Sequence, residues 1–124
     1  MAGISIALAT FNEEENIGSC LEALKDFSGE IIVVDGSSTD KTVEIAKEYG
    51  ARVIVTTNKP IFHINKQMAT DACHGDWILQ LDADEVVDQK LVSFIKRLNQ
   101  NISKLNKKQL AVCQPKAWWL KRKN

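Results

Sequence analysis

The chain has 124 residues, of which 44% are hydrophobic and 26% are charged. These fractions are those of a soluble globular protein, and the length suits one domain with a core of its own. No apolar run approaches the ~20 residues of a membrane-spanning helix, and the N-terminus carries no signal-peptide pattern. We therefore expect a cytoplasmic protein. Its three cysteines are expected to be free thiols, because their spacing suits no zinc site.

Charge divides the chain into two parts. Residues 1–88 hold all 16 acidic residues and six basic ones, a net charge of −10. Residues 89–124 hold ten basic residues and no acidic one, a net charge of +10. Two interpretations of this basic end stay open: a solvated helix and tail, or a segment that contacts anionic lipid at the inner face of the cell membrane. We expect no nucleic-acid partner.

The first elements are a strand over residues 4–8 and a helix after it. Asn12 is placed to cap this helix, with Glu15 in the capping-box position. The apolar side chains of the helix recur at helical spacing, at Ile17, Cys20, Leu21 and Leu24.

The same alternation continues along the chain. The patterns predict a strand over 30–35, a helix over 43–49 closed by Gly50, a strand over 52–56, a helix over 61–72, a strand over 76–81 and an amphipathic helix over 87–98. The apolar stripe of the third helix is expected at Ile61, Ile64, Met68 and Ala72. Two shorter runs, 109–113 and 116–120, are candidate strands.

This order predicts an α/β fold, in which helices flank a mostly parallel sheet. Ligands of such sheets bind beyond the carboxyl ends of the strands. Three predicted strands end in polar or acidic residues, at 10–13, at Asp35 and at 82–85. Their convergence on one edge of the sheet predicts a binding site there.

Asp82 and Asp84 are the strongest candidates for that site. Side chains alternate in an extended chain, so two carboxylates one residue apart face the same way. Such a pair suits Mg²⁺ or Mn²⁺, particularly when the phosphates of a ligand complete the coordination. Lys66 could offset phosphate charge, or be an ordinary surface lysine. Asp35 and Glu13 have structural alternatives as a helix cap and a first-turn charge.

With these residues in place, the chain resembles the family 2 glycosyltransferases, whose GT-A fold has a Rossmann-like nucleotide-binding half. Three blocks carry the resemblance, at residues 6–14, 33–42 and 75–85. It implies an inverting, metal-dependent hexosyltransferase with a nucleotide-sugar donor, commonly a UDP-sugar. The implied donor-binding residues are Thr10, Phe11, Glu13, Asp35, Lys66, Asp82, Ala83 and Asp84.

The resemblance also implies a metal site and an acceptor. Asp84, with Asp82 beside it, would hold Mg²⁺ or Mn²⁺ against the diphosphate. The nearest enzymes are bacterial ones of lipopolysaccharide-core biosynthesis, which implies an envelope glycan or a lipid-linked acceptor. Two family features are missing, since Ala9 stands where proline is frequent and Gly36 where many members have a second aspartate.

An inverting transfer needs a general base, and no acidic residue follows Asp88. We therefore expect no catalytic base in this chain and place it beyond Asn124. The chain then reads as one domain, apparently truncated, with a donor-binding core over 1–98 and a basic linker and start of the acceptor-side region over 99–124. The alternatives are a non-catalytic nucleotide-binding fragment and a sugar-phosphate nucleotidyltransferase. The latter is disfavoured by the acidic loop after the first strand.

Overall fold

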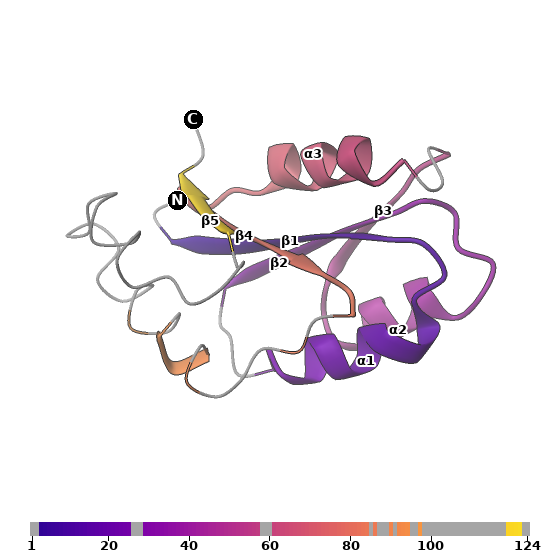
Figure 1. Cartoon of the computed structure of the whole chain (residues 1–124), viewed down its shortest axis with the longest axis horizontal. Coiled ribbons are helices and arrows are strands. Elements are labelled where there is room, and N and C mark those ends of the chain that lie inside the picture. Colours follow the sequence, from indigo (N-terminus) through magenta and orange to yellow (C-terminus); the bar gives the residue numbers. More distant parts are fainter. Residues whose placement is uncertain are drawn as a thin grey trace.

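A computed structural model describes residues 3–25, 29–57, 61–84, 86, 90, 92–94, 97 and 119–122. Its elements are β1 (Ile4–Thr10), α1 (Glu14–Glu22), β2 (Glu30–Asp35), α2 (Thr42–Glu48), β3 (Arg52–Val55), α3 (Phe62–Ala72), β4 (Trp77–Asp82) and β5 (Trp119–Arg122). The predicted α/β order is confirmed. Figure 1 shows one sheet with α1 and α2 on one face and α3 on the other.

The strand order in the sheet is β3-β2-β1-β4-β5. The first four strands are parallel, and β5 pairs with β4 in the antiparallel direction. Every residue of β1 is buried, as expected for a central strand covered on both faces. The chain passes from β1 to β2 on one side and later returns to β4 on the other. Because β2 and β4 lie on opposite sides of β1, a crevice forms beyond the carboxyl ends of these strands. Ligands of such folds bind in this crevice.

The layer of α1 follows the sequence prediction closely. Its four expected core residues, Ile17, Cys20, Leu21 and Leu24, are all 1% exposed or less. They pack with β1, β2 and β4 residues in one large apolar cluster. Burial of an apolar face of this kind stabilises a helix more than its intrinsic propensity does.

The predicted apolar stripe of α3 is right at Met68 and Ala72, which are half-buried and pack against the core, but wrong at Ile61 and Ile64. Ile61 and Ile64 are 42% and 40% exposed, whereas Asn65 and Ala69 are fully buried, followed by buried Cys73 just past the helix. These three residues are spaced four apart and therefore share one face. Small side chains on this face let the helix lie close to the sheet, where larger isoleucines would hold it away.

The predicted N-cap of α1 is also wrong. The helix begins at Glu14, so Glu13 occupies the cap position, and its side chain makes no capping hydrogen bond. Asn12 has a positive φ of 52°, and its side-chain oxygen accepts the Thr39 backbone N–H over 2.8 Å. The side chain of Asn12 therefore bonds to a distant loop instead of its own helix.

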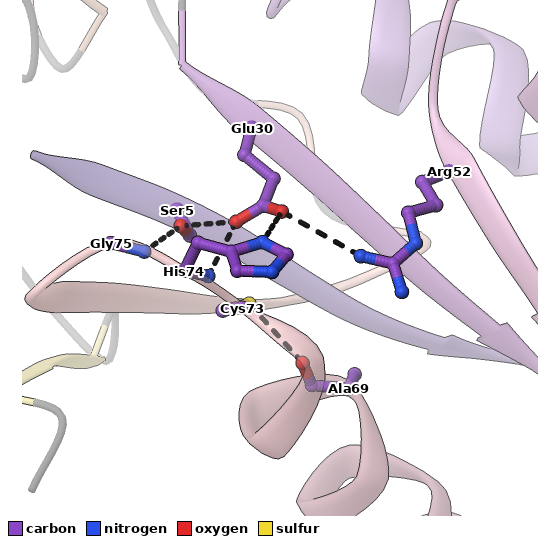
Figure 2. Close-up of polar contacts among 7 residues, drawn as sticks. All are labelled: Ser5, Glu30, Arg52, Ala69, Cys73, His74 and Gly75. Atoms are coloured by element: carbon purple, nitrogen blue, oxygen red, sulfur yellow. Dashed lines mark hydrogen bonds and ion pairs between the residues drawn. The ribbon is translucent and has the colours of Figure 1, made fainter. Parts of the chain in front are cut away.

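A polar cluster at the amino-terminal end of the strands surrounds the Glu30 carboxylate (Figure 2). The Ser5 hydroxyl and the His74 backbone N–H donate to Glu30 Oε2 over 2.8 and 2.7 Å, and His74 Nδ1 lies 2.7 Å from Oε1. Arg52 Nη1 lies 4.0 Å from Oε1. The cluster fastens the turn between α3 and β4 to β1 and β2.

Glu30 and Gly75 in this cluster show how tightly the turn is held. Burial alone raises the pKa of the Glu30 carboxyl, but hydrogen bonds from His74 and Ser5 outweigh it and leave the pKa below its usual value. The Gly75 N–H donates to Ser5 Oγ over 2.9 Å. A Cβ on Gly75 would lie 2.6 Å from that oxygen and 2.8 Å from the Gly3 carbonyl oxygen, so a larger residue does not fit.

The remaining predictions fall mainly on the C-terminal part. Residues 92–94 are helical within the helix predicted over 87–98, and Val92 is 3% exposed. β5 overlaps the candidate strand over 116–120, whereas the candidate strand over 109–113 lies outside the described residues. Cys20 and Cys73 are thiols outside any disulfide, as predicted, and both are buried. Within the described residues, no helix is long and apolar enough to cross a lipid bilayer.

Candidate functional site

The carboxyl ends of β1, β2 and β4 meet at one edge of the sheet. Thr10 pairs with Asp35 in the register of β1 and β2, and Ala9 pairs with Asp82 in that of β1 and β4. A pocket of about 270 Å³ lies at this edge and is lined by Ala9, Glu13, Lys66, Asp82, Ala83 and Asp84. Five of these six residues are ones that the sequence predicts as donor-binding.

Three layers of the fold contribute to the pocket. Asp82, Ala83 and Asp84 come from the end of β4, Glu13 from the segment that leads into α1, and Lys66 from α3. Figure 1 shows α1 and α3 on opposite faces of the sheet. The pocket therefore depends on the whole layered arrangement.

The two aspartates share the pocket for a different reason from the one predicted. β4 ends at Asp82, and Asp84 lies in the turn that follows. The turn, and not strand alternation, brings both exposed carboxylates to the same pocket, with Ala83 between them at 4% exposure. Ala83 belongs to the large apolar cluster that also contains the buried residues of α1.

Lys66 and Asp82 form an ion pair within the pocket. Lys66 Nζ lies 2.7 Å from Asp82 Oδ1, and the side chains are 37% and 54% exposed. A pair this accessible to water contributes only about 0–1 kcal/mol to stability. Its significance is chemical, since it places one cation beside two carboxylates at a strand end.

Thr10 and Asp35 are fully buried and bind each other. Thr10 Oγ1 donates to Asp35 Oδ1 over 2.7 Å. Ser38 donates its backbone N–H to Asp35 Oδ2 over 2.7 Å and its hydroxyl to Oδ1 over 2.6 Å. These contacts hold the turn after β2. The helix cap offered as the structural alternative for Asp35 is not observed, because α2 begins at Thr42 and its cap position is Lys41. Neither Thr10 nor Asp35, nor half-buried Phe11, is among the residues lining the pocket, so their donor-binding role stays a prediction.

Asn65, next to Lys66, is a residue that the sequence reasoning missed. It is fully buried, and the Thr56 hydroxyl donates to Asn65 Oδ1 over 3.1 Å. Thr56 in turn donates its N–H to the Asp35 carbonyl over 2.7 Å and accepts the Ser37 hydroxyl over 2.5 Å. This network ties the start of α3 to the ends of β2 and β3, which sets where Lys66 lies. The feature of the sequence that could have revealed Asn65 was a polar residue on the helix face that is buried.

The oxygen ligands at the pocket suit a hard divalent cation whose remaining ligands are phosphate and water. Within the described ranges, no three or more histidine, cysteine, aspartate or glutamate side chains gather as a metal site. Asp82 and Asp84 together offer carboxylate oxygens on an exposed pocket wall. Mg²⁺ and Mn²⁺ are commonly held by one or two carboxylates, with phosphate and water completing the shell. The residues present fit such an ion.

Comparison with known proteins adds a family likeness. Residues 5–121 match the family described as "Glycosyl transferase family 2". The chain is 44% identical over 93 residues to an uncharacterized glycosyltransferase of Rickettsia typhi, covering 73% of this chain and 31% of that protein. It is 30% identical over 104 residues to the lipopolysaccharide core biosynthesis glycosyltransferase LpsC of Rhizobium meliloti, covering 77% and 36%. The chain thus spans about a third of the length of these relatives.

A solved structure supports the same likeness in three dimensions. Glucosyl-3-phosphoglycerate synthase of Mycobacterium tuberculosis, crystallised with Mn²⁺, UDP and phosphoglyceric acid, superimposes with a TM-score of 0.65. The two sequences are 26% identical, and the match covers 82% of this chain and 39% of that one.

Proposed function

This chain belongs to the family 2 glycosyltransferases, and on that premise we propose that it binds the nucleotide-sugar donor, a UDP-sugar, of an inverting sugar transfer. The observation that carries the proposal is the pocket at the carboxyl ends of β1 and β4. It combines two exposed carboxylates, a lysine and Glu13 in about 270 Å³. Carboxylates of this kind can hold a divalent cation against phosphates, and a lysine can offset phosphate charge.

Within the proposal each pocket residue has a role. Asp84 is the principal ligand of Mg²⁺ or Mn²⁺, and Asp82 faces the ion or the ribose. When bound, the ion would act as a Lewis acid toward the departing nucleoside diphosphate. Lys66 lies within reach of the same space and would donate to phosphate oxygens. Glu13, which follows β1, lines the same pocket and would contact the nucleoside part of the donor.

The identity of donor and ion is supported by a neighbour. The M. tuberculosis enzyme with a similar fold was crystallised with both Mn²⁺ and UDP. The proposed acceptor, an envelope glycan or a lipid-linked sugar, is supported by the likeness to LpsC. Contact of the basic C-terminal segment with anionic lipid and the division of the chain at residue 98 belong to the same proposal. They concern residues that lie mostly outside the described ranges. No described residue is assigned as the general base.

The test is titration calorimetry with UDP, with and without Mn²⁺. We expect UDP to bind in the presence of Mn²⁺, and Asp84→Asn to weaken binding by about tenfold or more, since it removes a charged metal ligand. Asp76→Asn is the matched control, because Asp76 is an exposed acid at the opposite end of β4. Equal affinity of the Asp84 variant and wild type would refute the metal assignment. Absence of UDP binding by the wild type would refute the donor assignment.

A further inference from the structure

Three consecutive backbone N–H groups before and at the start of α1 donate to side chains within residues 38–42, which form the end of the loop after β2 and the first residue of α2. The Asn12 N–H donates to Ser38 Oγ over 2.8 Å, and the Glu13 N–H to Thr42 Oγ1 over 2.9 Å. The Glu14 N–H donates to Asp40 Oδ2 over 3.1 Å. Of these three residues only Glu14 lies in α1, and an N–H in the first turn has no partner within its own helix. Ser38 and Asp40 in the loop after β2, together with Thr42 at the start of α2, therefore fix the backbone that leads into α1.

Thr42 and Asp40 form the central part of this contact. Asp40 Oδ1 accepts both the Thr42 hydroxyl and, over 3.0 Å, the Thr42 backbone N–H. Since the hydroxyl proton points to Asp40, the oxygen of Thr42 is left to accept the N–H of Glu13. Thr42 is fully buried, so water does not replace this acceptor if the hydroxyl is removed.

The electrostatics of Asp40 agree with this arrangement. Burial tends to raise the pKa of the Asp40 carboxyl, but hydrogen bonds from the hydroxyl and N–H of Thr42 and the N–H of Glu14 lower it below its usual value. The carboxylate therefore keeps its acceptor role through the neutral pH range.

The residue at the centre of the three bonded amides is Glu13, which lines the pocket. We propose that Thr42 and Asp40 are positioning residues for nucleotide binding: they fix the backbone at Glu13 and so hold its carboxylate at the donor pocket. Neither Thr42 nor Asp40 is among the residues lining the pocket. The inference rests on the proposed function, because it needs Glu13 to act on the nucleotide.

The test is a double-mutant cycle on UDP affinity in the presence of Mn²⁺. Thr42→Val removes the hydroxyl at nearly constant volume and should weaken UDP binding about three- to tenfold, the range for one lost hydrogen bond. Thr42→Ser keeps the hydroxyl and should restore affinity close to the wild-type value. Glu13→Gln should weaken binding by itself. Adding Thr42→Val to it should then cost little more, because the valine acts through Glu13.

Each outcome decides between positioning and a purely structural role. Wild-type UDP affinity in Thr42→Val, or a valine effect that is undiminished in the Glu13→Gln background, overturns the proposal. If Thr42→Val does not fold, as judged by circular dichroism, Asp40→Asn takes its place, since half-buried Asp40 leaves no cavity when altered. Absence of UDP binding by the wild type removes the proposed function and the positioning role together. Binding by the wild type with an unaffected valine variant removes only the positioning role.

Discussion

Lys66→Met distinguishes two roles of the lysine: its ion pair with Asp82 and its proposed contact with the diphosphate. Lys66 Nζ lies 2.7 Å from Asp82 Oδ1, and both side chains are more than a third exposed. Losing this pair should therefore change the free energy of unfolding by no more than about 1 kcal/mol. The same substitution removes a cation from the space proposed for the diphosphate.

Lys66→Met should weaken UDP binding and strengthen Mn²⁺ binding. A charge-assisted hydrogen bond is worth about 1.5–3 kcal/mol, so losing one to phosphate should weaken UDP binding roughly 10- to 150-fold. Mn²⁺ alone should bind more tightly to Lys66→Met, because Asp82 no longer has a competing cation beside it. UDP affinity is measured by calorimetry in saturating Mn²⁺, and Mn²⁺ affinity by electron paramagnetic resonance of the free ion.

Lys47→Met supplies the control, as Lys47 is an exposed lysine on α2 that is not among the residues lining the pocket. It removes one positive charge from the chain without touching the proposed site and should leave both affinities near their wild-type values. The reasoning is refuted if Lys66→Met weakens Mn²⁺ binding as well, or if UDP affinity does not change.

Two further predictions concern the fold. Glu30→Gln should lower stability at neutral pH, and because the folded pKa of Glu30 is depressed, the difference from wild type should be full above about pH 4.5 and shrink as the pH falls below it. Urea unfolding from about pH 7 to about pH 3 tests this, and a difference that does not vary with pH would contradict it. Gly75→Ala should destabilise by about 1–3 kcal/mol, because its Cβ would meet Ser5 Oγ at 2.6 Å. Gly18→Ala within α1, where the nearest atom is 3.8 Å away, should instead stabilise by about 0.5–1 kcal/mol. Thermal melts of the two variants that shift in the same direction would refute this pair.

The sequence determined those features that depend on local periodicity. The strand over residues 30–35 has the predicted bounds, since a run of β-branched residues between turn residues has few alternatives. The apolar face of α1 was predicted residue by residue from its helical spacing. The acid pair Asp82 and Asp84 was recognisable because it directly follows the apolar run of β4.

Tertiary structure decided which polar groups meet. The cap of α1 was predicted at Asn12 from its immediate neighbours, yet the N–H of Glu14 is bonded by Asp40, 26 residues further on. Likewise, only the packing of α3 on the sheet brings Lys66 to Asp82. Such pairs depend on the register of parallel strands and on how far each helix lies from the sheet. Neither quantity is written in the spacing of residues along the chain.

The phase of α3 shows the same limit for apolar residues. By spacing alone, Ile61 and Ile64 are the natural core residues, and they are exposed. The sheet face beneath α3 is already filled by Ile32, Val34 and Ile78, so the helix presents its small residues to it. Local patterns determine that a segment is helical and amphipathic. The volume available between layers, which distant strands set, determines which face is buried.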